Sequence, residues 1–363
     1  MNALILLLAL SSRSQAADLI LDGESFAADG TLVYESVTLL NGSVLTVNDY
    51  DGTGSTGMLA IVADSIWVDA TSSIVASGGG YRGQLNAAGE GPGGGQGGSG
   101  YLDSGGGGAH GGDGGTGSRD GCTGTDGAGG VAYADESVIG HSMGSAGGAA
   151  GGADGDDGGY GANGGGSIWL QAASITIEGS IVTDGDSGTT YNNDATGGGA
   201  GGGVLLVANE LSCTGTIYAR GGSGGSVDDG GGSGGGGFIR QYYDESGLIC
   251  AVDVSPGTPG CGASAGATGI SLDNDYDFDG DGFTFAEGDC DPTDASINPD
   301  ATETWYDGID QDCDGANDYD QDGDGFELDD DCDDTDASIN PDATETWYDG
   351  VDQDCDGAND YDQ

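Results

Sequence analysis

The chain has 363 residues, and its 81 glycines and 63 acidic residues stand against only five basic residues, all of them arginine. The formal net charge of −58 repels nucleic-acid phosphates and anionic membrane surfaces, so both are excluded as partners, and metal cations or polycations remain. The same charge opposes a compact state unless bound cations neutralise it.

Residues 1–16 have the pattern of a secretion signal. An apolar run from Ala3 to Leu10 is too short to span a bilayer, and Ser14 and Ala16 are small residues at a plausible cleavage site. A buried first strand is the alternative, because no basic residue precedes the run. With eight cysteines, an even number, we expect disulfide bonds and a secreted, extracellular or bacterial cell-surface protein without a transmembrane segment.

Residues 17–245 are expected to be mainly β. A pattern of alternating apolar residues, a glycine and another apolar residue recurs four times, at residues 37–44, 66–76, 175–181 and 211–219. Alternating apolar residues line one face of a strand, and stacked units bury a core that no single unit could bury. The pattern favours a glycine-rich β-solenoid, similar to a right-handed parallel β-helix. A β-sandwich with long glycine-rich loops is the alternative.

Glycine dominates a long insertion at 79–166 and a shorter segment at 185–203. Two interpretations are open for these segments. They form flexible loops, because glycine loses much entropy when it is ordered. Alternatively, they are extended segments that pack side by side against the solenoid, since glycine alone permits very close approach of two backbones.

Residues 246–271 are expected to form a linker between two domains. Cys250 and Cys261 bracket a short proline- and glycine-containing stretch, and we expect them to form a disulfide that closes a small loop. Cys122 and Cys213 are then left, and could tie the long insertion to the solenoid. Spacing alone does not determine the connectivity.

Residues 272–363 contain a tandem repeat, with copies at 277–319 and 320–361 followed by the opening residues of a third. Each copy holds two D-x-D-x-D-G motifs, which begin at Asp277 and Asp310 and at Asp320 and Asp352. Acidic oxygens at positions 1, 3 and 5 and a backbone carbonyl at position 7 can surround one hard cation, and glycine at position 6 permits the sharp turn. We therefore predict bound Ca²⁺.

These loops are not complete EF-hands. The bidentate Glu expected at position 12 is Gly288 in the first loop and Asp331 in the third. Acidic residues further along are expected to close the sites. A disordered acidic tail that binds cations loosely is the alternative. The predicted ligands are Asp277, Asp279, Asp281, Phe283 (by its carbonyl), Asp289, Asp291, Asp310, Asp312 and Asp314, and in the second copy Asp320, Asp322, Asp324, Phe326 (by its carbonyl), Asp331, Asp333, Asp352, Asp354 and Asp356.

Two cysteines in each copy lie 23 residues apart, which predicts the disulfides Cys290–Cys313 and Cys332–Cys355. Small units with little apolar core depend on such cross-links. Zinc bound by thiolates is the weaker alternative, because two cysteines flanked by aspartates do not make a zinc ligand set.

Other residues of the repeat predict local structure. Asn298-Pro299 and Asn340-Pro341 are typical of a helix N-terminus, with Glu303 and Glu345 in the first two turns. Trp305 and Trp347 are expected to form the small core of each copy.

The motif D-x-D-G-D-G-F, followed by D-C-D and N-P-x-A-x-E-x-W-Y-D-G-x-D-x-D-C-D-G, resembles the MopE-type metal-binding repeats of bacterial secreted and surface proteins. The resemblance covers residues 277–361 and implies metal contact at the aspartates of these motifs. It also implies copper, yet the repeats contain no His or Met, which copper prefers. The glycine-rich region more loosely resembles β-helical stalks of bacterial surface proteins.

We expect no enzymatic activity but a structural or adhesive role, with cell-surface polysaccharide or other surface proteins as possible partners. A polysaccharide lyase or hydrolase and a copper-binding surface protein are the alternatives. Arg220, at the end of a strand unit, is the candidate base for a lyase. His110 and His141 lie in glycine-rich segments that we expect to be mobile.

Overall fold

The computed structural model describes residues 18–52, 56–98, 104–119, 121–134, 142–151, 159–191, 194–273, 279–284, 287–291, 294–316 and 318–358. The chain divides into two compact units, Met1–Asp273 and Asn274–Gln363. The expected signal peptide, His141 and Asp277 lie outside the described residues. Within those ranges the chain contains strands and turns but no α-helix.

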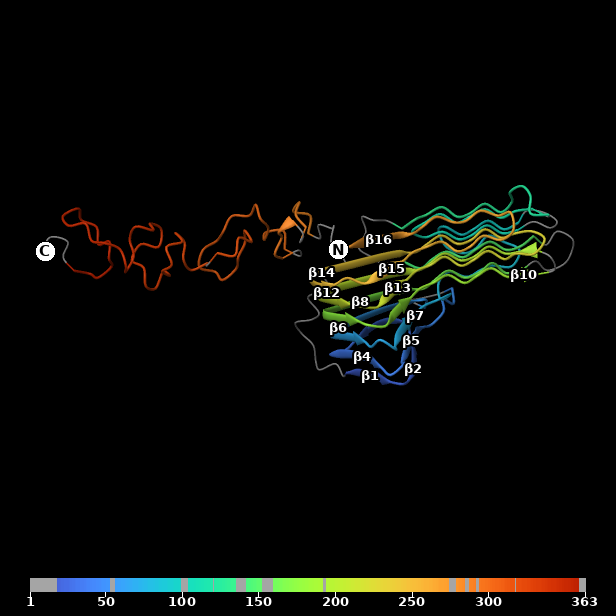
Figure 1. Cartoon of the computed structure of the whole chain (residues 1–363), viewed down its shortest axis with the longest axis horizontal. Coiled ribbons are helices and arrows are strands. Elements are labelled where there is room, and N and C mark those ends of the chain that lie inside the picture. Colours follow the sequence, from blue (N-terminus) through green and yellow to red (C-terminus); the bar gives the residue numbers. More distant parts are fainter. Residues whose placement is uncertain are drawn as a thin grey trace. The chain divides into compact units, whose positions relative to one another are not determined.

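Two large sheets form the first unit, and every strand pair in them is parallel (Figure 1). The longer sheet contains β1 (Leu19–Asp22), β3 (Gly30–Val33), β4 (Ser36–Leu40), β6 (Met58–Val68), β8 (Ser167–Ile177), β12 (Gly203–Cys213), β14 (Phe238–Leu248) and β16 (Ile270–Asp273). The shorter sheet contains β2 (Ser25–Ala28), β5 (Val44–Val47), β7 (Ser73–Val75), β9 (Ser180–Val182), β13 (Thr216–Tyr218) and β15 (Ala251–Asp253). A separate antiparallel pair joins β10 (Thr190–Tyr191) to β11 (Asp194–Ala195). The prediction of a mainly β unit is confirmed.

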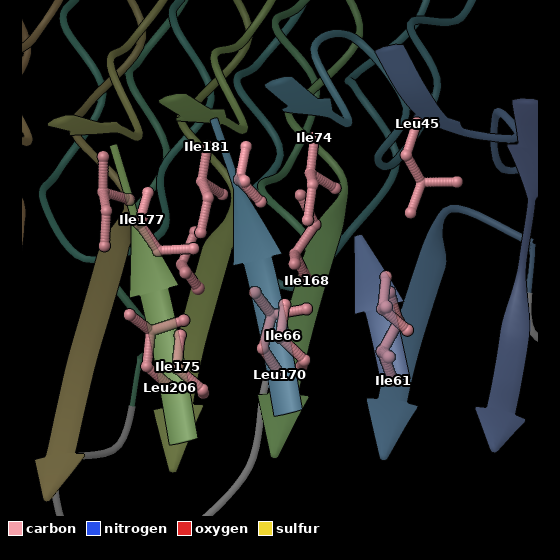
Figure 2. Close-up of a cluster of buried hydrophobic side chains, with 14 of the residues drawn as sticks. Leu45, Ile61, Ile66, Ile74, Ile168, Leu170, Ile175, Ile177, Ile181 and Leu206 are labelled. Atoms are coloured by element: carbon pink, nitrogen blue, oxygen red, sulfur yellow. The ribbon is translucent and has the colours of Figure 1, made fainter. Parts of the chain in front are cut away.

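The core consists of aliphatic columns that run across the strands. Ile61 of β6 lies opposite Leu170 of β8, which lies opposite Leu206 of β12, and all three are fully buried. In the shorter sheet Ile74 lies opposite Ile181 in the same way. Figure 2 shows these side chains pointing into the space between the two sheets. Burial of each such side chain contributes about 1.5–3 kcal/mol, which explains the apolar alternation in the sequence.

Glycine-rich segments connect the strands and extend side by side away from the sheets (Figure 1). We call them the glycine bundle, and it comprises the described residues of 78–166, 183–202, 219–237 and 254–269.

Hydrogen bonds in the glycine bundle repeat every third residue. The backbone N–H of Gly105 donates to Ala195 at 3.1 Å, and that of Gly108 donates to Gly198 at 2.9 Å. The residues between them donate to other neighbouring segments. A polyproline II helix has three residues per turn and makes no hydrogen bonds within itself, so its backbone groups bond to neighbouring segments with this period. The interpretation of extended glycine segments that pack side by side is therefore confirmed, but they pack on one another and extend away from the sheets rather than lying against them. The flexible-loop interpretation is wrong for the described residues of these segments.

Side chains are excluded from the bundle by the closeness of its segments. A Cβ atom on Gly107 would lie 1.9 Å from the carbonyl oxygen of Ser233, and one on Gly106 would lie 2.1 Å from that of Ala128. Neither distance is compatible with van der Waals contact. The glycine content of the sequence is thus a packing requirement of this bundle.

His110 is fully buried inside the glycine bundle. Its Nδ1 lies 2.9 Å from the carbonyl oxygen of Gly201, and its Nε2 lies 2.7 Å from the hydroxyl of Ser142. The expectation that His110 lies in a mobile segment is wrong, because its ring is held by both nitrogens and packs beside Tyr133.

The disulfides of the first unit join Cys122 to Cys261 and Cys213 to Cys250, with Cα–Cα distances of 5.2 and 4.8 Å. The predicted Cys250–Cys261 disulfide is therefore wrong, and so is a link between Cys122 and Cys213.

The reason is the extended conformation of the segment between Cys250 and Cys261. At about 3.1 Å per residue it separates the two cysteines by roughly 30 Å, whereas a disulfide needs a Cα–Cα distance under about 7 Å. Cys250 instead lies beside the end of β12, and Cys261 lies beside a turn of the long insertion.

The described residues of the second unit form turns and bends. Residues 294–304 form turns and bends rather than the predicted helix, and the side chain of Asn298 accepts the N–H of Asp300 at 3.0 Å. Asn-Pro thus begins a turn that does not continue as a helix. The prediction of a tryptophan core is also wrong, since Trp305 is only half-buried and Trp347 is 37% exposed.

No helix in the described ranges is long and apolar enough to cross a membrane.

Candidate metal centres

In the D-x-D-x-D-G motifs, the described carboxylates fold back onto the backbone of their own motif. In the motif that begins at Asp320, one oxygen of Asp320 accepts the N–H of Gly325 at 3.0 Å. Asp322 accepts the N–H of Asp324 at 3.2 Å, and Asp324 accepts that of Phe326 at 3.0 Å. These bonds use one oxygen of Asp322 and one of Asp324, so the second oxygen of each is available to a ligand.

Left-handed backbone at motif positions 4 and 6 produces the tight turn. Gly323 and Gly325 have φ of +74° and +99° in this motif. In the second motif of each copy, position 4 is a cysteine, and Cys313 and Cys355 have φ of +56° and +53°. Such angles are uncommon for residues with a Cβ atom.

The disulfides of the second unit hold these cysteines. Cys290 is bonded to Cys313 and Cys332 to Cys355, so both predicted pairs are confirmed. Each disulfide joins a cysteine that follows the first motif of a copy by several residues to position 4 of its second motif. No sulfur of these four cysteines is left as a thiolate.

Two equivalent groups of carboxylates, which we call the first-loop clusters, close the first motif of each copy. They are Asp279, Asp281 and Asp289 in the first copy and Asp322, Asp324 and Asp331 in the second. Within each group, one oxygen from each residue lies within 4.8 Å of the others. Asp289 and Asp331 follow the motif by several residues, as the sequence predicted for the closing ligands.

The closing aspartate of each first-loop cluster is shielded from solvent, and the other members are partly buried. Asp289 is 1% exposed and Asp331 is 7% exposed. One buried carboxylate oxygen in each of Asp281, Asp289, Asp324 and Asp331 has no hydrogen-bond partner among the described residues. Such oxygens are costly to bury unless a cation or a proton meets them.

Burial raises the pKa of Asp289 to about 6, and the charges of Asp281 and Asp279 raise it further. Burial also raises the pKa of Asp322. Both shifts have the direction expected of carboxylates gathered in one place without a compensating positive charge.

A second group, the second-loop cluster, contains Glu303, Asp310 and Asp312. One oxygen of Glu303 accepts the N–H of Gln311 at 2.9 Å and that of Asp312 at 3.3 Å. Its other oxygen is buried, and the described part of the chain offers it no hydrogen-bond partner.

The second copy repeats this local arrangement. Glu345 accepts the N–H of Gln353 at 3.0 Å, and Asp352 accepts that of Gly357 at 3.0 Å. Asp354 accepts the N–H of Asp356 at 3.3 Å.

Other predicted ligands take part in hydrogen bonds between carboxylates and backbone N–H groups. Asp314 and Asp356 accept the N–H of the residue two positions on, at 2.7 and 2.6 Å. The N–H groups of Asp291 and Asp333 donate to Asp289 and Asp331, at 3.0 and 2.9 Å. Ligation by the carbonyls of Phe283 and Phe326 stays a prediction.

Sequence reasoning missed three acidic residues of these sites. The Asn-Pro pattern places Glu303 and Glu345 in helices, although each precedes the second motif of its copy by the same seven residues, and this repeated spacing is the signal that could have found them. Asp334 was not considered at all, yet it forms a group with Asp320 and Asp322.

Comparison with known proteins identifies one family in this part of the chain. Residues 289–319 and 331–360 each match the Cu-binding MopE family model, described as "Putative metal-binding motif". The resemblance of the repeats to that family is thereby confirmed. No curated protein and no solved structure matches the chain.

Proposed function

We propose that residues 274–363 bind Ca²⁺ as structural ions, and that the chain is a secreted or cell-surface structural protein whose acidic repeats are ordered by those ions. The observation that carries the proposal is the pair of first-loop clusters. At the same place in two copies, three carboxylates each bring one oxygen within 4.8 Å of the others, and the closing aspartate has a buried oxygen without a hydrogen-bond partner among the described residues.

Calcium fits this donor set better than other metals. It takes about 6–8 oxygen ligands in flexible geometry, whereas Mg²⁺ keeps several waters and is bound by few carboxylates. The name of the matching family points to copper, which prefers imidazole, thioether or thiolate. The repeats contain no His or Met, and their four cysteines are in disulfides.

The four disulfides support an oxidising compartment, because such bonds are rare in reducing ones. The alternation of long and short strands along the first unit supports a β-solenoid, in which the two parallel sheets are successive faces of one coil. In that arrangement the solenoid and the glycine bundle are a rigid support. An adhesive role, with polysaccharide or surface-protein partners, is part of the same proposal.

The proposal includes no catalysis. Arg220, the candidate base, is paired with Asp184 at 2.5 Å and lies 4.6 Å from the ring centre of Tyr218. The same carboxylate also accepts the backbone N–H of Arg220 at 2.8 Å. This contact spans neighbouring segments of the bundle, which favours a structural role for the arginine.

The experiment is a titration of the full chain after removal of metal with a chelator. Isothermal calorimetry with Ca²⁺, Mg²⁺, Cu²⁺ and Zn²⁺ in turn should show binding of several Ca²⁺ per chain, with weaker Mg²⁺ binding. The variant Asp289→Asn, Asp331→Asn should lose two of these ions. The variant Asp300→Asn, Asp342→Asn makes the same charge change at exposed positions of the same repeats and should bind as the parent does.

Two results would contradict the proposal. One is the absence of calcium binding at millimolar concentration. The other is copper binding that excess calcium does not displace, which would favour a copper-binding surface protein.

A further inference from the structure

Asp334 lies at the boundary between the two copies and contacts the preceding copy. One of its oxygens accepts the hydroxyl of Tyr306 at 2.5 Å and the backbone N–H of Gln321 at 3.3 Å. Tyr306 belongs to the first copy and Asp334 to the second. A side chain of each copy is therefore part of the same hydrogen-bonded group.

The other oxygen of Asp334 is buried and has no hydrogen-bond partner among the described residues. The residue as a whole is only 2% exposed. One carboxylate oxygen of Asp334 lies within 4.8 Å of an oxygen of Asp320 and one of Asp322. Three carboxylates meet here, and a buried unpaired carboxylate oxygen among them is unfavourable without a positive charge.

Asp334 marks a difference between two otherwise nearly identical copies. From Asp289 to Asp320 and from Asp331 to Asp362 the sequences differ at two positions only: Pro292 corresponds to Asp334, and Ile309 to Val351. At this position the second copy thus has a carboxylate where the first copy has a proline.

Asp322 is shared between two groups. It belongs to the first-loop cluster with Asp324 and Asp331, and also to the group with Asp320 and Asp334. A carboxylate has two oxygens and can bridge two neighbouring cations.

We propose that Asp320, Asp322 and Asp334 form an additional site for a divalent cation at the junction of the copies. Asp322 also belongs to the first-loop cluster of the second copy, so it bridges the junction ion to the ion of that cluster. The second copy then holds one more ion than the first. The proposal rests on the proposed calcium binding.

The junction ion also links the copies mechanically. Tyr306 has a left-handed backbone with φ of +72°, and its N–H donates to a carboxylate oxygen of Asp318 at 2.9 Å. The side-chain oxygen of Gln321 lies 3.1 Å from the same hydroxyl. An ion bound to Asp334 holds in place the carboxylate that accepts the hydroxyl of Tyr306. Ion binding and the contact between the copies therefore stabilise each other.

The test counts ions bound by the full chain. Equilibrium dialysis of metal-free protein against Ca²⁺ gives the number bound at saturation, for the parent, for Asp334→Asn and for Asp342→Asn. The asparagine keeps an acceptor for Tyr306 and Gln321, so the hydrogen bonds at the junction are retained. The control removes one charge at an exposed position of the same copy.

We expect Asp334→Asn to bind one Ca²⁺ fewer per chain than the parent, and Asp342→Asn to bind the same number. An unchanged number for Asp334→Asn overturns the inference and indicates that a proton, not a metal ion, meets the carboxylates at the junction. If the parent itself binds no calcium, the proposed function fails as well.

A second variant keeps the test valid if Asp334→Asn perturbs folding. Tyr306→Phe leaves all three carboxylates in place and removes the hydroxyl that bonds Asp334. We expect it to bind the full number of ions, with at least a threefold weaker affinity for the weakest one. Unchanged affinities for every ion would contradict the link between the copies.

Discussion

The imidazole Nδ1 of His110 lies 2.9 Å from the carbonyl oxygen of Gly201, in a part of the glycine bundle that excludes water. A carbonyl oxygen only accepts hydrogen bonds, so Nδ1 carries the proton and donates it. Nε2 then accepts from the hydroxyl of Ser142. The ring is thus held in its neutral form, with both nitrogens satisfied.

Burial lowers the pKa of His110 to about 4, from an ordinary value of 6.5. Above pH 6.5 the residue is neutral in both the folded and the unfolded chain. As the pH falls from 6.5 toward 4, only the unfolded chain takes up the proton, so the free energy of unfolding should decrease, by about 3 kcal/mol in total. Denaturant unfolding of the first unit between pH 7.5 and 4 measures this loss.

The variant His110→Gln separates this effect from other acid-sensitive groups. It should lower stability at pH 7.5, because packing is disturbed, but should have a shallower pH dependence between 6.5 and 4 than the parent. Equal slopes for the two proteins would show that His110 is not the group responsible.

The stability lost on replacing a glycine of the bundle by alanine should depend on how close the neighbouring backbone lies to the added Cβ. A Cβ at Gly107 would meet the carbonyl of Ser233 at 1.9 Å, so Gly107→Ala should reach or exceed the upper end of the about 1–3 kcal/mol range for overpacking. Gly121 has no atom within 4 Å of its Cβ position but has φ of +71°, so Gly121→Ala should cost only about 1 kcal/mol. Thermal unfolding of both variants checks the order, and equal losses would contradict the close packing of the segments.

The connectivity of the first unit predicts which peptides remain linked after digestion without reduction. Mass spectrometry should find Cys122 linked to Cys261 and Cys213 linked to Cys250. Cys122→Ser with Cys261→Ser should lower stability by about 2–5 kcal/mol, because the disulfide closes a long loop. Recovery of a Cys250–Cys261 peptide would contradict the arrangement of the extended segments.

Glu303 and Glu345 are predicted to be cation ligands of the second-loop motifs. Glu303→Gln keeps an acceptor for the N–H of Gln311 but removes the charge. We expect the affinity of one site to fall at least about 10-fold, as losses of that size follow even from disturbing groups that only support metal ligands. Asp300→Asn, an exposed change in the same copy, is the matched control in a calcium titration. If Glu303→Gln binds calcium with unchanged affinity, Glu303 is not a ligand and only the aspartates bind the ion.

Local patterns in the sequence were sufficient for the strands and for part of the candidate site. The segment Ile175-Thr-Ile177-Glu-Gly179-Ser-Ile181 contains the apolar alternation and the bend that separate β8 from β9. The duplication of Cys290 and Cys313 at an interval of 42 residues likewise predicted two disulfides that the structure contains. Both features depend on neighbouring residues or on an exact repeat.

The remaining features depend on where distant segments meet. The partner of Cys261 follows from the course of extended glycine segments, which have no side-chain pattern that fixes their neighbours. Turns place Glu303 beside Asp310 and Asp312, whereas the Asn-Pro pattern predicts a helix in the same residues. Asp334 takes the place of Pro292 in an otherwise almost identical segment, and only the fold shows that this substitution lies at the junction of the copies.

Hydrogen exchange of the full chain, followed by mass spectrometry with and without a calcium chelator, tests the central proposal most directly. Calcium-loaded protein should show slow exchange in backbone N–H groups that donate to carboxylates, such as those of Gly325 and Gln311. Chelation should make residues 279–358 exchange fast while strands β6, β8 and β12 keep their protection. Equal protection of the repeats with and without calcium would contradict the account.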